Sequence, residues 1–219
     1  MGSRKYPKIY PPFPRYTEGL LKNKFNRNKF FSPEVGFLFE MQWLWTEKID
    51  GTNIRVHWDG NRVTYGGKSD NAQIPAKLLP ALNDMFPEEL FEQIWGADSF
   101  TLYGEGYGAG IQSGGIYRPD QSFILFDILS HSEQGDIWLH DINVISVADK
   151  FGIESVPHVG YFTPKDVVNY VQEGLLLPGH TPKCLPDRVE GYVGRAPLGL
   201  LNRKGERIIM KVKYGDFDD

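Results

Sequence analysis

The residues best suited to chemistry lie in one stretch, residues 45–53, which reads WTEKIDGTN. Lys48 ends an apolar, strand-like run, and Asp50, Gly51 and Asn53 follow it. A lysine amine attacks an electrophile only when it is neutral. A nearby anion keeps the proton on the amine, so Asp50 alone would not activate Lys48. Gly51 permits a tight turn and a close approach of ligand to backbone. In isolation, K-x-D-G is more often a solvated strand end with an Asp-Gly turn.

Three further clusters have residue types that suit a phosphate or sugar ligand. Glu105 stands between glycines, where no neighbouring side chain blocks its reach to a ligand hydroxyl. Glu190 lies in the short apolar run 189–193. Lys211 and Lys213 share one face of a predicted strand, because residues i and i+2 point to the same side. Two ammonium groups on one face suit a triphosphate, although lysines are also common on solvent-facing edge strands.

Two glycine-rich segments resemble nucleotide-binding loops but depart from the required spacing. A dinucleotide loop beginning at residue 104 would need glycine where Ala109 and Ile111 stand, and no helix is predicted after it. The segment 66–69 (GGKS) resembles the end of a phosphate-binding P-loop, but Arg62 occupies the position of its first glycine. Neither motif is therefore predicted.

Composition indicates an ordinary globular protein of 219 residues, with 41% hydrophobic and 24% charged residues. The 24 glycines, 14 phenylalanines and 11 tyrosines favour a strand-rich fold with many turns. The single cysteine, Cys184, excludes an intrachain disulfide and a cysteine-rich zinc site. No apolar run has the length of a signal peptide core or a membrane span, so we expect a cytoplasmic protein with no membrane partner.

The charge is unevenly distributed along the chain. The net charge of −4 does not indicate a nucleic-acid-binding protein. Residues 1–30, however, contain only one acidic residue, Glu18, against eight basic ones, which are Arg4, Lys5, Lys8, Arg15, Lys22, Lys24, Arg27 and Lys29. This basic N-terminal lead-in is predicted either to follow a phosphate backbone or to be a solvated terminal segment.

Periodicity predicts a strand-dominated α+β fold in a single domain, residues 1–219. Strands are predicted, from alternating or continuous apolar residues, at 36–47, 52–58, 62–68, 99–107, 122–129, 136–140, 188–195 and 206–213. Helices are predicted at 74–95, where Pro87 splits the segment in two, at 141–151, and at 163–173 after an N-cap threonine. The helix at 141–151 is expected to turn Ile142, Ile145, Val147 and Ala148 inward.

Taken together, these clusters form an ordered series that resembles motifs I, III, IIIa, IV and V of the covalent nucleotidyltransferases. The matching segments are Lys48-x-Asp50-Gly51, Glu105-Gly106, Phe123-x-x-Phe126-Asp127, Glu190-Gly191 and Lys211-x-Lys213. That superfamily contains the ATP-dependent RNA ligases, the DNA ligases and the mRNA capping enzymes. The stretch Glu47–Asn53 is most similar to the RNA ligase 2 type, since it carries that type's asparagine. The resemblance covers residues 45–213 and implies an ATP-grasp-like nucleotidyltransferase domain, with antiparallel sheets flanked by helices.

The resemblance implies a three-step reaction. Lys48 attacks the α-phosphorus of ATP, pyrophosphate leaves, and a lysyl-adenylate remains. AMP then passes to a 5′-phosphate end, and a 3′-hydroxyl displaces it to seal the strand. Such phosphoryl transfer depends on positioning and on neutralising charge.

By the same resemblance, the charged residues divide into phosphate and metal ligands. Lys211 and Lys213 would hold the α-phosphate and lower the pKa of Lys48 by like-charge repulsion. Asp50 and Glu190 are carboxylates suited to Mg²⁺ or its bound waters, with Mn²⁺ as an alternative ion.

The remaining matched residues are implied to contact the nucleotide. Asn53 would join the water network of the metal, and Glu105 would bind a ribose hydroxyl. Phe126 would stack on the adenine, although its apolar strand also suits a simple core position. Glu47 and Ile49, which flank the lysine, are included among the expected nucleotide-binding residues.

This chain departs from the pattern at two places. The family's next motif offers an arginine after the hairpin, where this chain has Lys68, a point charge that cannot form a bidentate contact. A basic contact to ATP phosphate or to the nucleic-acid end is still expected there. The chain also ends six residues after Lys213, with no room for the C-terminal OB or helical domain of its relatives. We therefore expect a minimal, monomeric catalytic domain.

An ATP-dependent RNA ligase acting on RNA ends or nicked duplexes is the favoured interpretation. A minimal DNA ligase shares all these motifs, and only a test of substrates would separate the two. A guanylyltransferase fits less well, because Asn53 follows the ligase pattern. A nucleic-acid-binding module with a degenerate ligase fold is the alternative of a different class. It gives no chemical reason to keep Lys48, Glu105 and Glu190.

Overall fold

Two hydrophobic cores organise the chain in the computed structural model, which describes residues 4–184 and 189–217. The first core belongs to unit 1, formed by residues 1–7 and 49–156. The second belongs to unit 2, formed by residues 8–48 and 157–219. The chain therefore passes between the units after Pro7, Lys48 and Val156. Whether they act as a single domain stays a prediction.

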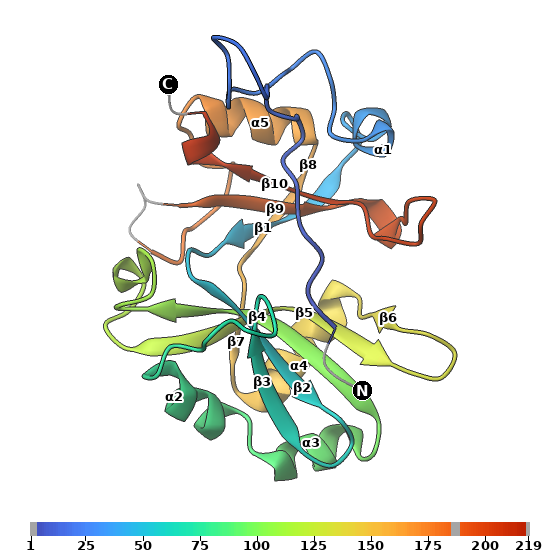
Figure 1. The fold of residues 1–219 in the computed structure, drawn as a ribbon, viewed down its shortest axis with the longest axis vertical. Coiled ribbons are helices and arrows are strands. Elements are labelled where there is room, and N and C mark those ends of the chain that lie inside the picture. The colour runs from blue at the N-terminus through green and yellow to red at the C-terminus, as the bar shows by residue number, and fades with distance from the viewer. Residues whose placement is uncertain (1–3, 185–188, 218–219) are drawn as a thin grey trace. The chain divides into compact units, whose positions relative to one another are not determined.

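Unit 1 is built on an antiparallel sheet of strand order β3-β2-β4-β5-β6, with β7 pairing parallel to β5 (Figure 1). Its strands are β2 (Thr52–Trp58), β3 (Val63–Gly67), β4 (Ser99–Gly108), β5 (Gln121–His131), β6 (Ile137–Trp138) and β7 (Glu154–Ser155). Its helices are α2 (Leu78–Met85), α3 (Glu88–Trp95), the short η1 (Gly114–Ile116) and α4 (Asp141–Phe151). The predicted turn at 59–61 and the division of 74–95 at Pro87 are both confirmed.

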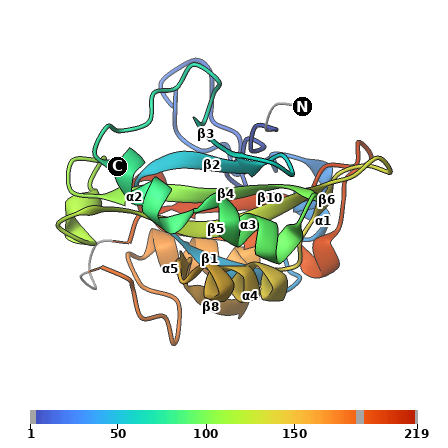
Figure 2. The same cartoon turned by 90° about the horizontal axis from the view of Figure 1, so that it is seen from below.

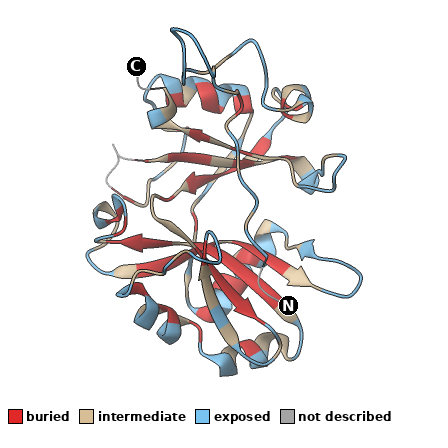
Figure 3. Ribbon diagram, in the orientation of Figure 1, coloured by how far each residue is buried: buried red, intermediate tan, exposed pale blue. Residues whose placement is uncertain are grey.

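One face of this sheet is apolar and packs against helices. Alternation along β2 places Ile54, Val56 and Trp58 in the first core, together with residues of α2, α3 and α4. Figure 2 shows these helices along the sheet, and Figure 3 shows how the strands of this unit are buried. The burial of this face fixes which side chains of β2 point the other way, because alternate residues must take the opposite side.

The opposite face of the same sheet carries polar side chains. Asn53, Arg55 and His57 alternate with the core residues of β2, and Arg55 and His57 are nevertheless buried. Strand register places Asn53 opposite Glu105 on β4 and Arg55 opposite Tyr103. Because directly opposed residues share a face, these residues form a polar face of the sheet, on which Arg55, His57 and Tyr103 are buried.

Unit 2 is a four-stranded antiparallel sheet of order β10-β9-β1-β8 (Figure 1). Its strands are β1 (Trp43–Lys48), β8 (His158–Phe162), β9 (Gly191–Arg195) and β10 (Ile209–Lys213). Its helical segments are α1 (Pro33–Phe37), α5 (Pro164–Gln172), η2 (Pro197–Gly199) and η3 (Tyr214–Asp216). The predicted N-cap of α5 is confirmed, since Thr163 Oγ1 accepts a hydrogen bond from Asp166 N.

Three sequence-based expectations are corrected. The segment 36–47 is not one strand, because α1 occupies its start: Ser32 caps that helix, Pro33 fills its first position, and the strand begins at Trp43. The last strand begins at Ile209 rather than at residue 206. In α4, Ile142 is 65% exposed, whereas Val144 lies in the core.

Strand β9 begins at Gly191, three residues later than predicted, and the predicted start at Arg188 lies outside the described residues. No helix among residues 4–184 and 189–217 combines the length and apolar character needed to cross a membrane.

Candidate active site

The nucleophile candidate Lys48 is the last residue of the central strand β1, and strand register sets its neighbours. Lys48 pairs with Gly191 of β9, and Gly191 pairs on its other side with Lys213 of β10. The next row on this face consists of Thr46, Val193 and Lys211. Residues in register across a sheet share a face, so the three lysines Lys48, Lys211 and Lys213 project from one side of unit 2.

The glycine in this row is required by the packing around it. A Cβ at Gly191 would collide with the carbonyl oxygen of Val212 on β10. The position also stands between Lys48 and Lys213, so the absence of a side chain lets the two ammonium groups approach a common partner.

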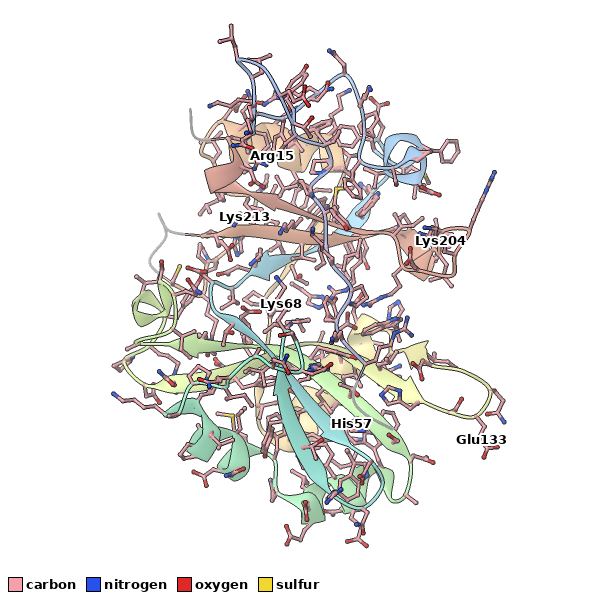
Figure 4. The ribbon with its side chains drawn as sticks, in the orientation of Figure 1. Arg15, His57, Lys68, Glu133, Lys204 and Lys213 are labelled. Carbon is pink, nitrogen blue, oxygen red and sulfur yellow. The ribbon has the colours of Figure 1, made fainter. Side chains whose placement is uncertain are left out.

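That partner is Glu190. Its Oε2 lies 2.5 Å from Lys48 Nζ, and its Oε1 lies 3.0 Å from Lys213 Nζ. One carboxylate thus holds the nucleophile candidate and one motif V lysine. Figure 4 labels Lys213 on β10. Since three ammonium groups face one carboxylate, this face of unit 2 has an excess of positive charge that suits a phosphate.

Lys211 lies on the same face of unit 2, and its environment disfavours its charged form. Burial lowers the pKa of Lys211 most, and the positive charges of Lys48 and Lys213 lower it further. Asp216 and Glu190 act in the opposite direction. A phosphate oxygen beside Lys211 would relieve both the burial cost and the like-charge repulsion.

The predicted metal ligand Glu190 fits an ion that arrives with a phosphate. Both of its oxygens already bind lysine Nζ atoms. Among the residues that the structure describes, no group of three or more His, Cys, Asp or Glu side chains could hold a metal alone. Magnesium is commonly bound by one or two carboxylates together with substrate phosphates, which is the donor set available here.

Glu47 precedes the nucleophile candidate, but its side chain points to the opposite face and is fully buried. Its Oε2 accepts hydrogen bonds from His180 Nε2 and from Lys183 N, both at 3.0 Å. The ring of His180 also contacts the hydroxyl of Tyr192 through Nδ1, at 3.0 Å. Any nucleotide contact from Glu47 would therefore come from its backbone. Sequence reasoning missed His180, because a lone histidine in a loop gives no signal of this pairing.

In unit 1, Asp50 and Gly51 form a tightly packed turn. Asp50 N donates to the hydroxyl of Tyr117, and Asp50 Oδ2 accepts from Ser113 N, both at 3.2 Å. A Cβ at Gly51 would collide with the carbonyl oxygen of Gly106. The Asp-Gly pair thus holds the glycine-rich loop after β4. Ile49, also predicted to bind nucleotide, is buried in a small apolar cluster.

Strand register brings Asn53 and Glu105 together. They face each other across β2 and β4. Asn53 Oδ1 is buried, and it has no hydrogen-bond partner among the residues that the structure describes. A buried acceptor without a partner carries an energetic cost that a ligand donor can remove. This atom therefore marks a point where a hydroxyl or amino group of a ligand would bind.

Phe126 is placed by an irregularity in β5. Tyr103 pairs with Asp127 and Gly104 pairs with Leu125, so Phe126 is the extra residue of a β-bulge. Its ring is only partly buried, at the edge of the cluster that contains Ile49. A ring held by a bulge and left partly open suits stacking on a base, and its packing against this cluster also suits the alternative of a residue at the edge of the core.

Lys68 follows β3 and is exposed (Figure 4). Gly67, the residue before it, accepts a hydrogen bond through its carbonyl oxygen from Arg55 Nε, at 2.8 Å. Arg55 also contacts Asp70 through Nη2, at 3.0 Å. The strand end that carries Lys68 is therefore anchored to β2, while the lysine itself is available to a ligand.

The basic lead-in does not form one free cationic arm. Arg4 pairs with Asp136 at 3.2 Å, and Lys5 pairs with Asp70 at 2.9 Å, both within unit 1. In unit 2, Arg15 pairs with Asp216. The exposed Lys22 and Lys29 remain as candidates for phosphate contact.

Two separate groups of predicted residues are thus assembled. Unit 2 brings together Lys48, Glu190, Lys211 and Lys213, and unit 1 brings together Asn53 and Glu105. The peptide bond between Lys48 and Ile49 joins the units at this point of the chain.

The structures most similar to this chain include several forms of one ligase. One is an apo variant of Naegleria gruberi RNA ligase, with 17% sequence identity and a TM-score of 0.61 over 84% of this chain and 53% of that chain. A variant with ATP and Mn has 18% identity and a TM-score of 0.60 over 83% of this chain and 52% of that chain. The ligase with pyrophosphate has 18% identity and a TM-score of 0.62 over 97% of this chain and 60% of that chain. This chain spans little more than half the length of these proteins. The likeness confirms the predicted α+β nucleotidyltransferase fold.

The sequence itself gives an independent result. No curated protein is significantly similar to this chain in sequence. A sequence model of the RNA ligase family, however, matches residues 41–213, which is most of the chain and contains every motif from Lys48 to Lys213. The chain therefore belongs to the RNA ligase family.

Proposed function

We propose that this protein is an ATP-dependent RNA ligase that forms a lysyl-AMP intermediate on Lys48. The observation that carries the proposal is the row Lys48–Gly191–Lys213 with Glu190 bound to both lysines. A lysine grouped with two further lysines and one carboxylate is suited to attack the phosphoanhydride of a nucleoside triphosphate. Membership of the RNA ligase family supports the same activity.

In the first step, the neutral Nζ of Lys48 forms a bond to the α-phosphorus of ATP. The bond from that phosphorus to the bridging oxygen breaks, and its electron pair leaves with pyrophosphate. One ammonium proton passes to solvent before the attack, and a second passes from the nitrogen to solvent as the phosphoramide forms. The charges of Lys211 and Lys213 balance the negative charge that develops on the phosphate. Nζ must leave Glu190 for the attack.

A second group of residues would bind the nucleoside part of ATP. Glu105 would accept a hydrogen bond from a ribose hydroxyl. Asn53 would join the water network of the metal, and a bound water would give its Oδ1 the donor that it lacks. Phe126 would stack on the adenine ring. Backbone groups of Glu47 and Ile49 would contact the base.

Glu190 and Asp50 are each proposed as a ligand of a divalent ion, through oxygen or bound water. When present, Mg²⁺ or Mn²⁺ neutralises the negative charge of the phosphates. Solved structures of Naegleria gruberi RNA ligase variants include one with ATP and Mn and one with AMP and Mn, which supports the use of a divalent ion.

The remaining steps transfer AMP from Lys48 to a 5′-phosphate end and then release it when a 3′-hydroxyl attacks. We include in the proposal an RNA substrate, with Lys68 contacting its end, and a role for a monomeric, cytoplasmic enzyme in RNA repair. A minimal DNA ligase would use the same Lys48 chemistry, so comparison of nicked RNA with nicked DNA separates the two.

The decisive experiment is incubation of the protein with α-labelled ATP and Mg²⁺, followed by a denaturing gel and mass spectrometry. We expect the label on Lys48 with ATP but not with GTP. Absence of label, in protein first shown to contain no bound AMP, would contradict self-adenylation and favour a nucleic-acid-binding module. After labelling, nicked RNA, nicked DNA and single strands are supplied in turn, and sealing of DNA alone would contradict the proposed substrate.

A further inference from the structure

The N-terminal strap, which we define as residues 4–6, is bound to unit 1 by three consecutive side chains. Each of them contacts a different carboxylate: Arg4 Nη1 lies 3.2 Å from Asp136, Lys5 Nζ lies 2.9 Å from Asp70, and Tyr6 Oη lies 2.8 Å from Asp127. The strap also binds through its backbone, because Tyr103 Oη donates to the carbonyl oxygen of Arg4, at 2.7 Å. Four contacts over three residues hold this segment in a defined position.

Tyr6 is the residue of the strap that contacts Phe126, which is proposed to stack on the adenine. Its ring meets Phe126 edge-on, with centroids 5.0 Å apart and planes at 76°. It also packs on Tyr103 at 5.1 Å and on Trp138 at 5.6 Å. Edge-on contacts are directional, so the Tyr6 ring restricts the orientation of the Phe126 ring.

The hydroxyl of Tyr6 acts on the same short segment of β5. It donates to Asp127 Oδ2, and Asp127 Oδ1 accepts from Ile128 N at 3.2 Å. Asp127 is 1% exposed and follows the bulged residue Phe126 directly. A bulge lacks part of the regular ladder of hydrogen bonds, so side-chain contacts have a larger share in fixing its geometry.

We propose that Tyr6 is a positioning residue for the adenine site: it holds the bulge and the ring of Phe126 in the orientation needed to stack on the base. The inference rests on the proposed function, since it takes Phe126 as the adenine-stacking residue. It extends that function to a segment more than 40 residues before the first ligase motif, to which the motif pattern assigns no role. The strap would thus affect the affinity for the nucleoside part of ATP and leave the affinity for pyrophosphate unchanged.

The test compares Tyr6→Ala and Tyr6→Phe in the full chain. Tyr6→Ala removes both the ring edge and the hydroxyl. We expect the apparent KM for ATP, the concentration that gives half the maximal single-turnover rate of self-adenylation, to rise roughly 10-fold while that maximal rate changes little. Tyr6→Phe keeps the ring and should raise KM by only about 2- to 5-fold. Tyr10→Ala is the matched control, because Tyr10 is a tyrosine of the same lead-in that stacks on Phe31 within unit 2, and its KM should not change.

A second readout separates positioning from general damage to the fold. In the reverse reaction, the adenylated protein and pyrophosphate regenerate ATP, and the KM for pyrophosphate should be the same in Tyr6→Ala and in the unaltered protein. A rise in both KM values together with a lower melting temperature in both variants would show a purely structural role and overturn the proposal. An ATP KM within twofold of normal in folded Tyr6→Ala would also overturn it.

The outcome can be separated from failure of the proposed function. If the unaltered protein forms no adenylate on Lys48, the ligase activity fails, and ATP binding is then measured by equilibrium dialysis. Weaker ATP binding by Tyr6→Ala than by the unaltered protein and by Tyr10→Ala would support the positioning role. Equal binding, or no binding by any of the three proteins, would overturn it.

Discussion

Lys48 and Glu190, 142 residues apart in sequence, form an ion pair in which Nζ and Oε2 are 2.5 Å apart. The same carboxylate holds Lys213 through its other oxygen at 3.0 Å. Glu190 thus holds the amine of the nucleophile candidate beside a second lysine. In the proposed function, a phosphate of the incoming nucleotide takes the place of the Glu190 carboxylate.

Removal of the nucleophile provides the first prediction. Lys48→Ala should abolish the formation of protein-linked AMP, because no other group can form the phosphoramide bond at that position. Labelling with α-labelled ATP measures the effect. Lys204→Ala is the control, since Lys204 is an exposed lysine in the loop before β10 (Figure 4) and should label normally. Normal labelling of Lys48→Ala would contradict the assignment of the nucleophile.

Glu190→Gln tests the shared carboxylate. A neutral amide cannot balance the ammonium groups of Lys48 and Lys213, so we expect the single-turnover rate of self-adenylation to fall roughly 10- to 100-fold. Glu173→Gln, at the exposed end of α5, is the matched control and should retain the normal rate. A normal rate in Glu190→Gln would remove Glu190 from the site.

Lys211 provides a test of pH dependence. Its pKa is lowered by burial and by Lys48 and Lys213, so below that lowered pKa the folded state bears the cost of a partly desolvated charge. Because the unfolded chain binds this proton more tightly, the cost disappears as the pH rises from the lowered pKa to the ordinary value near 10.5. Lys211→Met should therefore raise the melting temperature at pH 7, by roughly 1–3 °C after solvent screening.

The matching measurement is a pair of thermal melts at pH 7 and near pH 10.5. The stabilisation by Lys211→Met should shrink at the higher pH, because more than half of Lys211 in the folded, unaltered protein is then neutral. A gain that is equal at both pH values would show that the methionine acts through packing. ATP binding should weaken in this variant at either pH, since one phosphate ligand is lost.

Lys68 is expected to serve the later steps. It lies after β3 and outside the Lys48 turn, so Lys68→Ala should slow the sealing of pre-adenylated RNA more than self-adenylation. Sealing rates and labelling rates are compared for Lys68→Ala and for Lys77→Ala, an exposed lysine just before α2. Equal losses in both steps would instead assign Lys68 to ATP.

The exposed basic residues of the lead-in are tested by charge reversal, because deletion of residues 1–30 would remove Phe13 from the core of unit 2. Lys22→Glu with Lys29→Glu should weaken RNA binding and reduce its salt dependence, by a slope of about 0.7 for each lost phosphate contact on a single strand. Lys150→Glu with Lys204→Glu is the control of equal charge. Unchanged affinity at low salt would leave the segment as a solvated surface.

Local sequence patterns predicted the parts of this protein that depend on neighbours along the chain. The hairpin of β2 and β3 follows from alternation and the turn at 59–61, and α5 follows from Thr163 and Pro164. The ordered motifs from Lys48 to Lys213 predicted the family, because each reads as a short segment of fixed residue types. The wrong start of the first strand had a local cause too, since Ser32 and Pro33 favour the helix α1.

The tertiary structure alone decided which distant residues meet. The row of Lys48 with Gly191 and Lys213 depends on strand register, which is fixed by the burial of Tyr192 and Val212 on the opposite face and not by any local pattern. The bulge at Phe126 and its contact with Tyr6 depend in the same way on packing between segments. Sequence thus determined the chemical groups and their order. Burial of one apolar face in each of the two sheets determined which of these groups became partners.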